Sequence, residues 1–221
     1  MKKQILLFAS IAISTLAMAQ SKTSFGFRGG LSAAGMKGDA VDNLQNLISV
    51  TDGMVTTKSN TGLFGGVYAS IPVSEKISIE PGLYYAQKGY EIKGSLDLKG
   101  VEFLVVNARA QLKSHYIDLP VLVKANFNGL QLFAGPQVSY LSKADLKTTA
   151  GLLGFNLLNK TMDATDQFNR WDASVVGGVG YQFKNGFNVS AAYDHGLSKV
   201  DANKNLDSYN RSVKVAVGFN F

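Results

Sequence analysis

The sequence predicts an all-β fold, an eight-stranded antiparallel up-and-down β-barrel, from two observations. Segments of about 11 residues alternate apolar and polar side chains, so each strand would have one apolar and one polar face. The connections between these segments alternate between short and long. A chain that turns back after every segment forms successive antiparallel hairpins, and eight strands suffice to close a small barrel.

The alternation is clearest in the last segment, where the odd positions from Val213 to Phe221 are apolar and the even ones are polar or small. Phe133 is an exception, because it is apolar but occupies a position on the otherwise polar face of its segment. We predict strands near residues 25–34, 61–72, 77–90, 114–127, 130–141, 171–183, 187–197 and 209–221.

Three connections are short: residues 72–76, Asn128-Gly129 and residues 184–186. An Asn-Gly pair between alternating segments is a strong hairpin signal, because type I′ turns need positive φ at both positions. The long connections are residues 35–60, 91–113, 142–170 and 198–208. Strict alternation favours a transmembrane barrel with short periplasmic turns and long outer loops over a soluble barrel.

The composition of the polar face supports the transmembrane interpretation. This face carries Arg28, Glu80, Asp118 and Lys124 among many Gly and Ser residues, which cannot fill a hydrophobic core but fit the narrow lumen of an eight-stranded barrel. Aromatic residues gather at the strand ends, as in the girdles at membrane interfaces. They are Phe25, Phe27, Phe127, Tyr140, Trp171, Phe183, Phe187, Phe219 and Phe221.

The N-terminus predicts export. Residues 1–19 have two lysines, an apolar stretch and an Ala-Met-Ala cleavage site, as in a signal peptide. Residues 20–221 would then be one outer-membrane β-barrel domain in the cell outer membrane. Removing Lys2 and Lys3 from the 22 basic residues leaves 20 against 16 acidic ones. This mild charge makes nucleic acid an unexpected partner, and the chain has no cysteine for disulfides or thiolate metal sites.

Four stretches resemble the PorT-type outer-membrane β-barrel family, which is abundant in Bacteroidetes. They are PGLYYAQKGY (81–90), YIDLPVLVKANF (116–127), LFAGPQVSYL (132–141) and YDHGLSKV (193–200). The resemblance covers essentially the whole mature chain and implies the outer membrane of a Gram-negative bacterium. The family's namesake takes part in secretion, but no residue of this sequence indicates that role.

The sequence offers little for catalysis, and we expect no enzyme, no cofactor and no metal. Of the two histidines, His195 follows Asp194 directly, and neighbours in a strand face opposite sides. We predict a structural or surface-binding barrel that acts through its outer loops; the alternative is an accessory subunit of a secretion or transport assembly. Expected partners are outer-membrane lipid, barrel-assembly machinery that reads the C-terminal Phe221, and a secretion complex or surface ligand.

Two sets of candidate site residues follow from strand parity. Arg28, Glu80 and Lys124 lie at similar depth on the lumen face, with Asp118 on the same face, so Glu80 is predicted to pair with Arg28 or Lys124. A buried charge without a partner would cost several kcal/mol. The alternative is that water solvates these charges.

The second set comes from residues 90–116, where the pattern inverts. There the positions that continue the lumen-facing series of each strand are apolar, and those that continue the lipid-facing series are polar. This predicts a hairpin that rises beyond the bilayer, turns near Lys99-Gly100 and keeps even-numbered residues inward on both strands. Its inward side chains and those of two loops would form a hydrophobic cap over the barrel mouth, or else an exposed patch for a partner or lipid ligand. The set is Leu44, Ile48, Ile92, Leu96, Leu98, Leu104, Val106 and Phe155.

Overall fold

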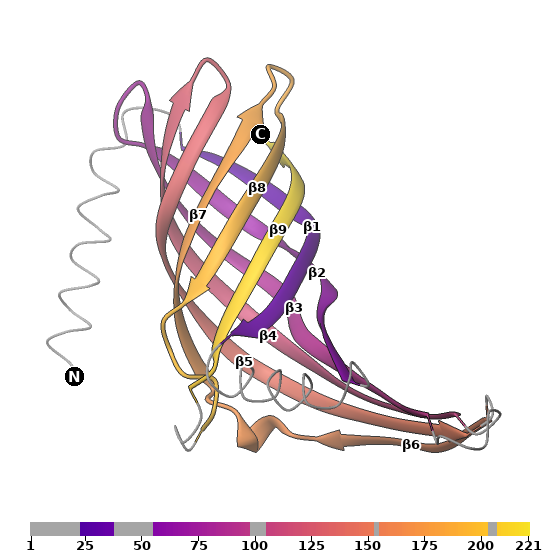
Figure 1. The fold of residues 1–221 in the computed structure, drawn as a ribbon. Helices are drawn as coiled ribbons and strands as arrows, with labels where there is room; N and C mark the ends of the chain where they lie inside the picture. The colour runs from indigo at the N-terminus through magenta and orange to yellow at the C-terminus, as the bar shows by residue number, and fades with distance from the viewer. Residues whose placement is uncertain (1–22, 38–54, 98–104, 153–154, 203–206) are drawn as a thin grey trace, which may run out of the picture.

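The computed structural model describes residues 23–37, 55–97, 105–152, 155–202 and 207–221, which form one antiparallel sheet of nine strands (Figure 1). A three-residue 3-10 helix precedes the seventh strand. No helix among these residues is long or apolar enough to cross a membrane. The elements are β1 (Ser24–Lys37), β2 (Val55–Pro72), β3 (Ile77–Asp97), β4 (Val105–Phe127), β5 (Leu130–Leu152), β6 (Phe155–Asp163), η1 (Thr165–Gln167), β7 (Trp171–Gln182), β8 (Phe187–Gly196) and β9 (Tyr209–Asn220).

Eight of the nine strands close into a ring, and this confirms the predicted barrel. The sheet runs β4-β3-β2-β1-β9-β8-β7-β5-β6, and a further pairing of β4 with β5 closes it. At the seam between the first and last strands, Phe25 N donates to Phe221 O over 3.2 Å and Phe221 N donates to Phe25 O over 2.8 Å. A closed ring pairs the backbone of every strand on both sides, which a lipid environment requires.

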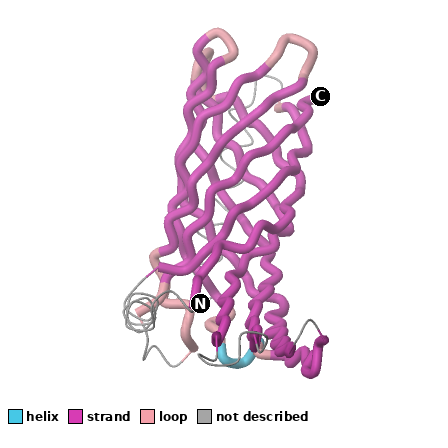
Figure 2. The backbone as a smooth tube through the Cα atoms, turned by 45° about the vertical axis from the view of Figure 1, so that its right-hand side comes forward, coloured by secondary structure: helices cyan, strands magenta, loops and turns pink. Residues whose placement is uncertain are grey.

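The short connections lie together at one end of the barrel, here called the turn end, with the C-terminus beside them (Figure 2). Asn128 and Gly129 have φ of +53° and +97°, so the predicted Asn-Gly hairpin is confirmed. The helix η1 lies at the opposite end.

Four strands are longer than predicted. β2, β3, β4 and β5 contain 18, 21, 23 and 23 residues, and they continue past the ring at the end opposite the turns (Figure 1). There residues 55–59 of β2 pair with residues 90–94 of β3. β6 pairs with the end of β5 and with no other described strand. We call this part the extension: residues 55–59, 89–97, 105–114, 143–152 and 155–163.

Residues 91–97 and 105–113 are strand, as the predicted hairpin over 90–116 requires. The expectation of a loop over most of 142–170 was wrong, because residues 142–152 and 155–163 satisfy their backbone hydrogen bonds by pairing with β4 and with each other.

The register within the extension agrees with the predicted hairpin. Tyr90 pairs with Leu112 and Leu96 with Val106, so even-numbered residues share one face on both strands, as predicted. The turn itself lies outside the described residues. In β5 a bulge at Ser142, opposite His115, changes the inward parity from odd to even. Leu112, Tyr116, Leu141 and Ala144 are consequently buried together at the base of the extension.

The ring is inside-out relative to a soluble barrel. Val217 is 63% exposed, whereas Lys214 on the opposite face is 8% exposed. Exposed leucines, valines and isoleucines cover the outside, and this apolar band is the surface that lipid covers. Exposed aromatic side chains border the band near the turns (Phe25, Phe27, Phe127, Tyr181, Phe183, Phe187 and Phe221) and toward the extension (Tyr85, Tyr140, Trp171 and Tyr193).

Candidate functional site: the charged lumen and the extension

The lumen holds eight buried charged side chains among the residues that the structure describes, and their signs balance. All project inward because they have the parity opposite to the lipid-facing residues of their strands. The acidic ones are Glu80, Asp118, Asp172 and Asp194, and the basic ones are Arg28, Lys88, Lys124 and Lys214.

The first cluster is centred on Glu80, which is 1% exposed. Arg28 Nη1 donates to Glu80 Oε1 over 2.9 Å, and Lys124 Nζ donates to Glu80 Oε2. Arg28 also donates to the Tyr84 hydroxyl over 3.3 Å. Each carboxylate oxygen thus has its own cationic donor, and the cluster has a net charge of one positive unit.

The second cluster is centred on Asp118 and lies toward the extension. Lys88 Nζ donates to Asp118 Oδ1 over 3.0 Å, and Lys214 Nζ donates to Asp118 Oδ2 over 3.1 Å. Lys214 also lies 2.6 Å from Asp194 Oδ2, so it bridges two carboxylates. Ser139 accepts from Lys88 over 3.4 Å and joins the cluster to the polar wall of β5.

Aromatic rings support the buried cations. The guanidinium of Arg28 lies 4.5 Å from the ring centre of Tyr68, and Lys88 Nζ lies 4.6 Å from that of Tyr116. Lys214 lies 5.4 Å from the ring centre of Phe64. The negative face of a ring attracts a cation most strongly where water is excluded, so these rings help to hold each cation in one position.

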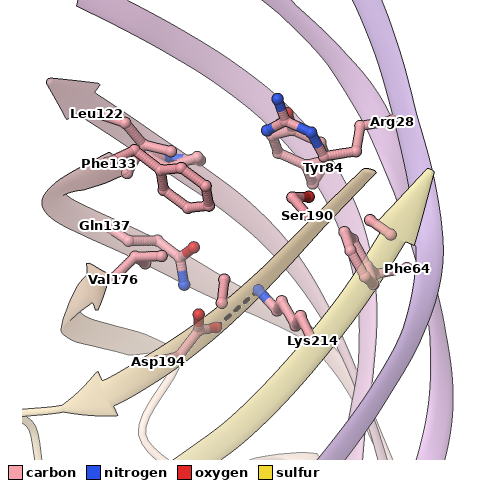
Figure 3. A pocket seen from close by; sticks show the side chains of 13 residues that line it. Arg28, Phe64, Tyr84, Leu122, Phe133, Gln137, Val176, Ser190, Asp194 and Lys214 are labelled. Atoms are coloured by element: carbon pink, nitrogen blue, oxygen red, sulfur yellow. Dashed lines mark hydrogen bonds and ion pairs between the residues drawn. The ribbon is translucent and has the colours of Figure 1, made fainter. Parts of the chain in front are cut away.

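A small cavity of about 40 Å³ separates the two clusters (Figure 3). Arg28 and Tyr84 line one side of it, and Asp194 and Lys214 line the other. Arg28 Nε and Asp194 Oδ1 are buried and have no hydrogen-bond partner in the protein. A cavity of this size accepts one or a few water molecules, and these two atoms are the kind of group that such water bonds.

The predicted cluster of Arg28, Glu80, Asp118 and Lys124 is only partly brought together. Glu80 contacts both of its proposed partners, whereas Asp118 belongs to the second cluster. Sequence reasoning missed the lysines that hold Asp118 and the pairing of Asp194. Their signal was available, because Lys88 shares the parity of Glu80 in β3 and Lys214 lies on the polar face of β9.

The proposed cap falls largely outside the described residues. Leu44, Ile48, Leu98 and Leu104 lie outside them altogether. Ile92, Leu96, Val106 and Phe155 belong to strands, but their side chains are outside the described part.

The base of the extension is described, and there the inner face is apolar, with Tyr90 and Phe168 packed against the buried cluster that contains Leu112. The opposite face is polar: Arg109 Nε lies 2.8 Å from Glu91 Oε1.

The two histidines lie on the outside of the barrel. His115 Nδ1 is 2.5 Å from the Tyr85 hydroxyl at the edge of the lipid-facing band. His195 is exposed while its neighbour Asp194 is buried in the lumen, so the two side chains face opposite sides, as predicted. Among the described residues, no group of three or more His, Asp or Glu side chains could hold a metal ion.

Comparison with known proteins gives a family and several loosely similar structures. A family model described as "Outer membrane protein beta-barrel domain" matches residues 18–202. No curated protein sequence matches the chain.

Among solved structures, the attachment invasion locus protein Ail of Yersinia pestis is 12% identical, with a TM-score of 0.41, over 91% of this chain and 100% of that one. The outer membrane protein OprG from Pseudomonas aeruginosa is 15% identical, with a TM-score of 0.43, over 92% and 98%. The outer membrane protease OmpT from Escherichia coli is 12% identical, with a TM-score of 0.35, over 90% and 93%. Similarities this loose say nothing about activity.

Proposed function

This chain belongs to the outer membrane protein beta-barrel domain family and is an integral protein of the outer membrane, and from this premise we propose that it is a non-enzymatic surface protein that binds through its extension. The observation that carries the proposal is that β2, β3, β4 and β5 continue beyond the lipid-facing band while ion pairs fill the lumen. A sheet that projects from a filled barrel offers a rigid surface to molecules outside the membrane.

The proposal includes an orientation. The short turns and the C-terminus would face the periplasm and the extension the cell exterior, which is the usual arrangement of short and long connections in such barrels. Export would use residues 1–19 as a signal peptide. The C-terminal Phe221, 72% exposed at the turn end, would be read by the barrel-assembly machinery. Deleting Phe221 should then lower the amount of assembled protein, and unchanged assembly would contradict this role.

The lumen has a structural role in this proposal. Two ion-pair clusters and buried aromatic rings occupy it, and eight strands leave room only for side chains. Purified protein in planar bilayers should therefore give no steady open-channel current. A stable conductance in the wild type, lost when the protein is heat-denatured, would contradict a plugged lumen.

The second candidate is an accessory subunit of a secretion or transport assembly, as a PorT-type relationship would imply. One observation favours it: β6 pairs only with β5 among the described strands. The other edge of β6 can accept an extended segment of a partner protein by strand addition.

Site-specific photo-crosslinking in whole cells tests both candidates. A photoreactive amino acid at Lys147, exposed on the outer face of the extension, or at Thr161 on β6 should capture a partner. Lys184, exposed in a turn at the opposite end, is the matched control. Capture of a surface ligand at Lys147 favours the first candidate, and capture of a membrane-assembly protein at Thr161 favours the second. Capture only at Lys184 would contradict both.

A further inference from the structure

The outer surface carries a cationic patch at the end of the lipid-facing band nearest the extension. His115 on β4 pairs with Lys143 on β5, and both point outward. Arg170 directly precedes Trp171 of β7, and its Nη1 donates to Ser142 O over 3.4 Å, which places the guanidinium beside Lys143. Lys113 lies two residues beyond His115 on the same face of β4 and is exposed.

An apolar and aromatic wall adjoins this patch on the side toward the turn end. Tyr140 pairs with Trp171, and their rings meet edge to face with centres 5.0 Å apart. Val138, the next outward residue of β5 toward the turn end, is also exposed. Aromatic side chains in such a position mark the level of lipid headgroups, so Lys143 and Arg170 lie at or just beyond that level.

Three acidic residues lie beside these cations and weaken the patch: Asp145, Asp163 and Asp166. Lys147, the next exposed outward residue of β5 beyond Asp145, brings the cations on this face to four, so the acidic residues do not cancel the patch. Lys143 Nζ lies 2.9 Å from Asp145 Oδ1, and Arg170 Nη2 lies 3.0 Å from Asp166 Oδ1. The side chains of Lys143, Arg170 and Asp166 are 55%, 41% and 96% exposed, and that of Asp145 is 22% exposed. Water screens both pairs, so each contributes little. A doubly charged phosphate can displace such partners, because guanidinium–phosphate bonds are charge-assisted and can be bidentate.

We propose that Lys143 and Arg170, above the wall of Val138, Tyr140 and Trp171, bind the phosphate of an acylated glycolipid in the adjoining membrane leaflet. The phosphate would lie between the ammonium and the guanidinium, with Lys113 and His115 adding positive potential from β4. The acyl chains would lie along the wall below. A site with cations next to an apolar surface favours a phosphorylated lipid over a free phosphate or an unphosphorylated lipid.

Binding of lipid A to the folded full-length protein in a neutral detergent tests the proposal, and lipid-bound species can be counted by native mass spectrometry. The test does not depend on which end faces the cell exterior, so its failure is separate from failure of the proposed surface function. Bisphosphorylated lipid A should bind, and its dephosphorylated form should bind at least about tenfold more weakly, which corresponds to about 1.4 kcal/mol.

Variants locate the site. Lys143→Gln with Arg170→Gln should reduce lipid A binding at least about tenfold, whereas Lys76→Gln with Lys184→Gln, at the turn end, should leave it unchanged. Asp145→Asn with Asp166→Asn should strengthen binding, because it removes two of the three competing carboxylates. Heat-dependent gel migration shows that each variant is folded, and Lys143→Arg, which keeps the charge, should bind as the wild type does.

Three results would overturn the proposal. One is equal binding by the wild type and the Lys143→Gln/Arg170→Gln variant. Another is equal binding of phosphorylated and dephosphorylated lipid. The third is full displacement of lipid A by inorganic phosphate, which would mean that the patch recognises a free anion and not a lipid.

Discussion

Replacing Glu80 with glutamine is the sharpest perturbation of the lumen. The change keeps the shape of the side chain and removes its charge, so the net charge of the first cluster rises from one to two positive units. Glu80 is 1% exposed and holds Arg28 at 2.9 Å as well as Lys124. Removing one member of a buried ion pair typically costs about 3–5 kcal/mol, because the remaining charge stays buried without compensation. We expect a loss of this size in the free energy of unfolding.

Reversible urea unfolding in lipid vesicles, followed by tryptophan fluorescence and gel migration, measures this loss. Asp166→Asn is the matched control, since its ion pair with Arg170 is exposed and should contribute only about 0–1 kcal/mol. Combining Glu80→Gln with Lys124→Met returns the cluster to one positive unit and should recover part of the stability. If Glu80→Gln unfolds at the same urea concentration as the wild type, water solvates these charges and the cluster is not structural.

Two further predictions concern the lumen packing and the region around η1. A Cβ on Gly178 would lie 2.4 Å from a backbone oxygen and 2.5 Å from the Phe133 ring, whereas one on Gly177 would meet nothing within 4 Å. Gly178→Ala should therefore lower the urea midpoint and Gly177→Ala should not; equal midpoints would show that the ring can move aside. Asp163 accepts hydrogen bonds from the Thr165 hydroxyl and from its amide over 2.9 Å, and these bonds lower the pKa of Asp163. A lowered pKa stabilises the folded state above the unfolded value of about 4, so amide exchange at Thr165 should accelerate as the pH falls through the lowered pKa, and exchange without pH dependence beyond the intrinsic rate would contradict the contact.

The ring of strands could be predicted because its signals are local. In β9 the lipid imposes a strict two-residue alternation, and Asn128-Gly129 encodes its own turn. The parity of Glu80 likewise placed it in the lumen, and its depth relative to Arg28 and Lys124 followed from counting along each strand. In these cases the residues of one strand or one turn contain the information that determines its local structure.

The inverted pattern of residues 90–116 predicted the hairpin of β3 and β4, but the β5–β6 part of the extension and the second cluster could not be predicted in the same way. β6 has no clean alternation, and its residues 159–163 are exposed on both faces, so no single environment selects its side chains. The contact of Asp118 with Lys214 joins residues 96 positions apart. It depends on how far each strand is staggered around the ring, which the pattern within one strand does not contain. Asp118 was thus assigned to the correct face and to the wrong cluster.

The central claim is that the extension projects from the cell surface while the short turns face the periplasm. The chain has no cysteine, so a single introduced thiol reports its own location without further changes. Thr161→Cys on β6 and Lys184→Cys in a short turn both place the thiol at an exposed position. A membrane-impermeant maleimide on intact cells should label the cysteine at 161 and should label that at 184 only after the outer membrane is permeabilised. Labelling of 184 but not 161 in intact cells would contradict the account.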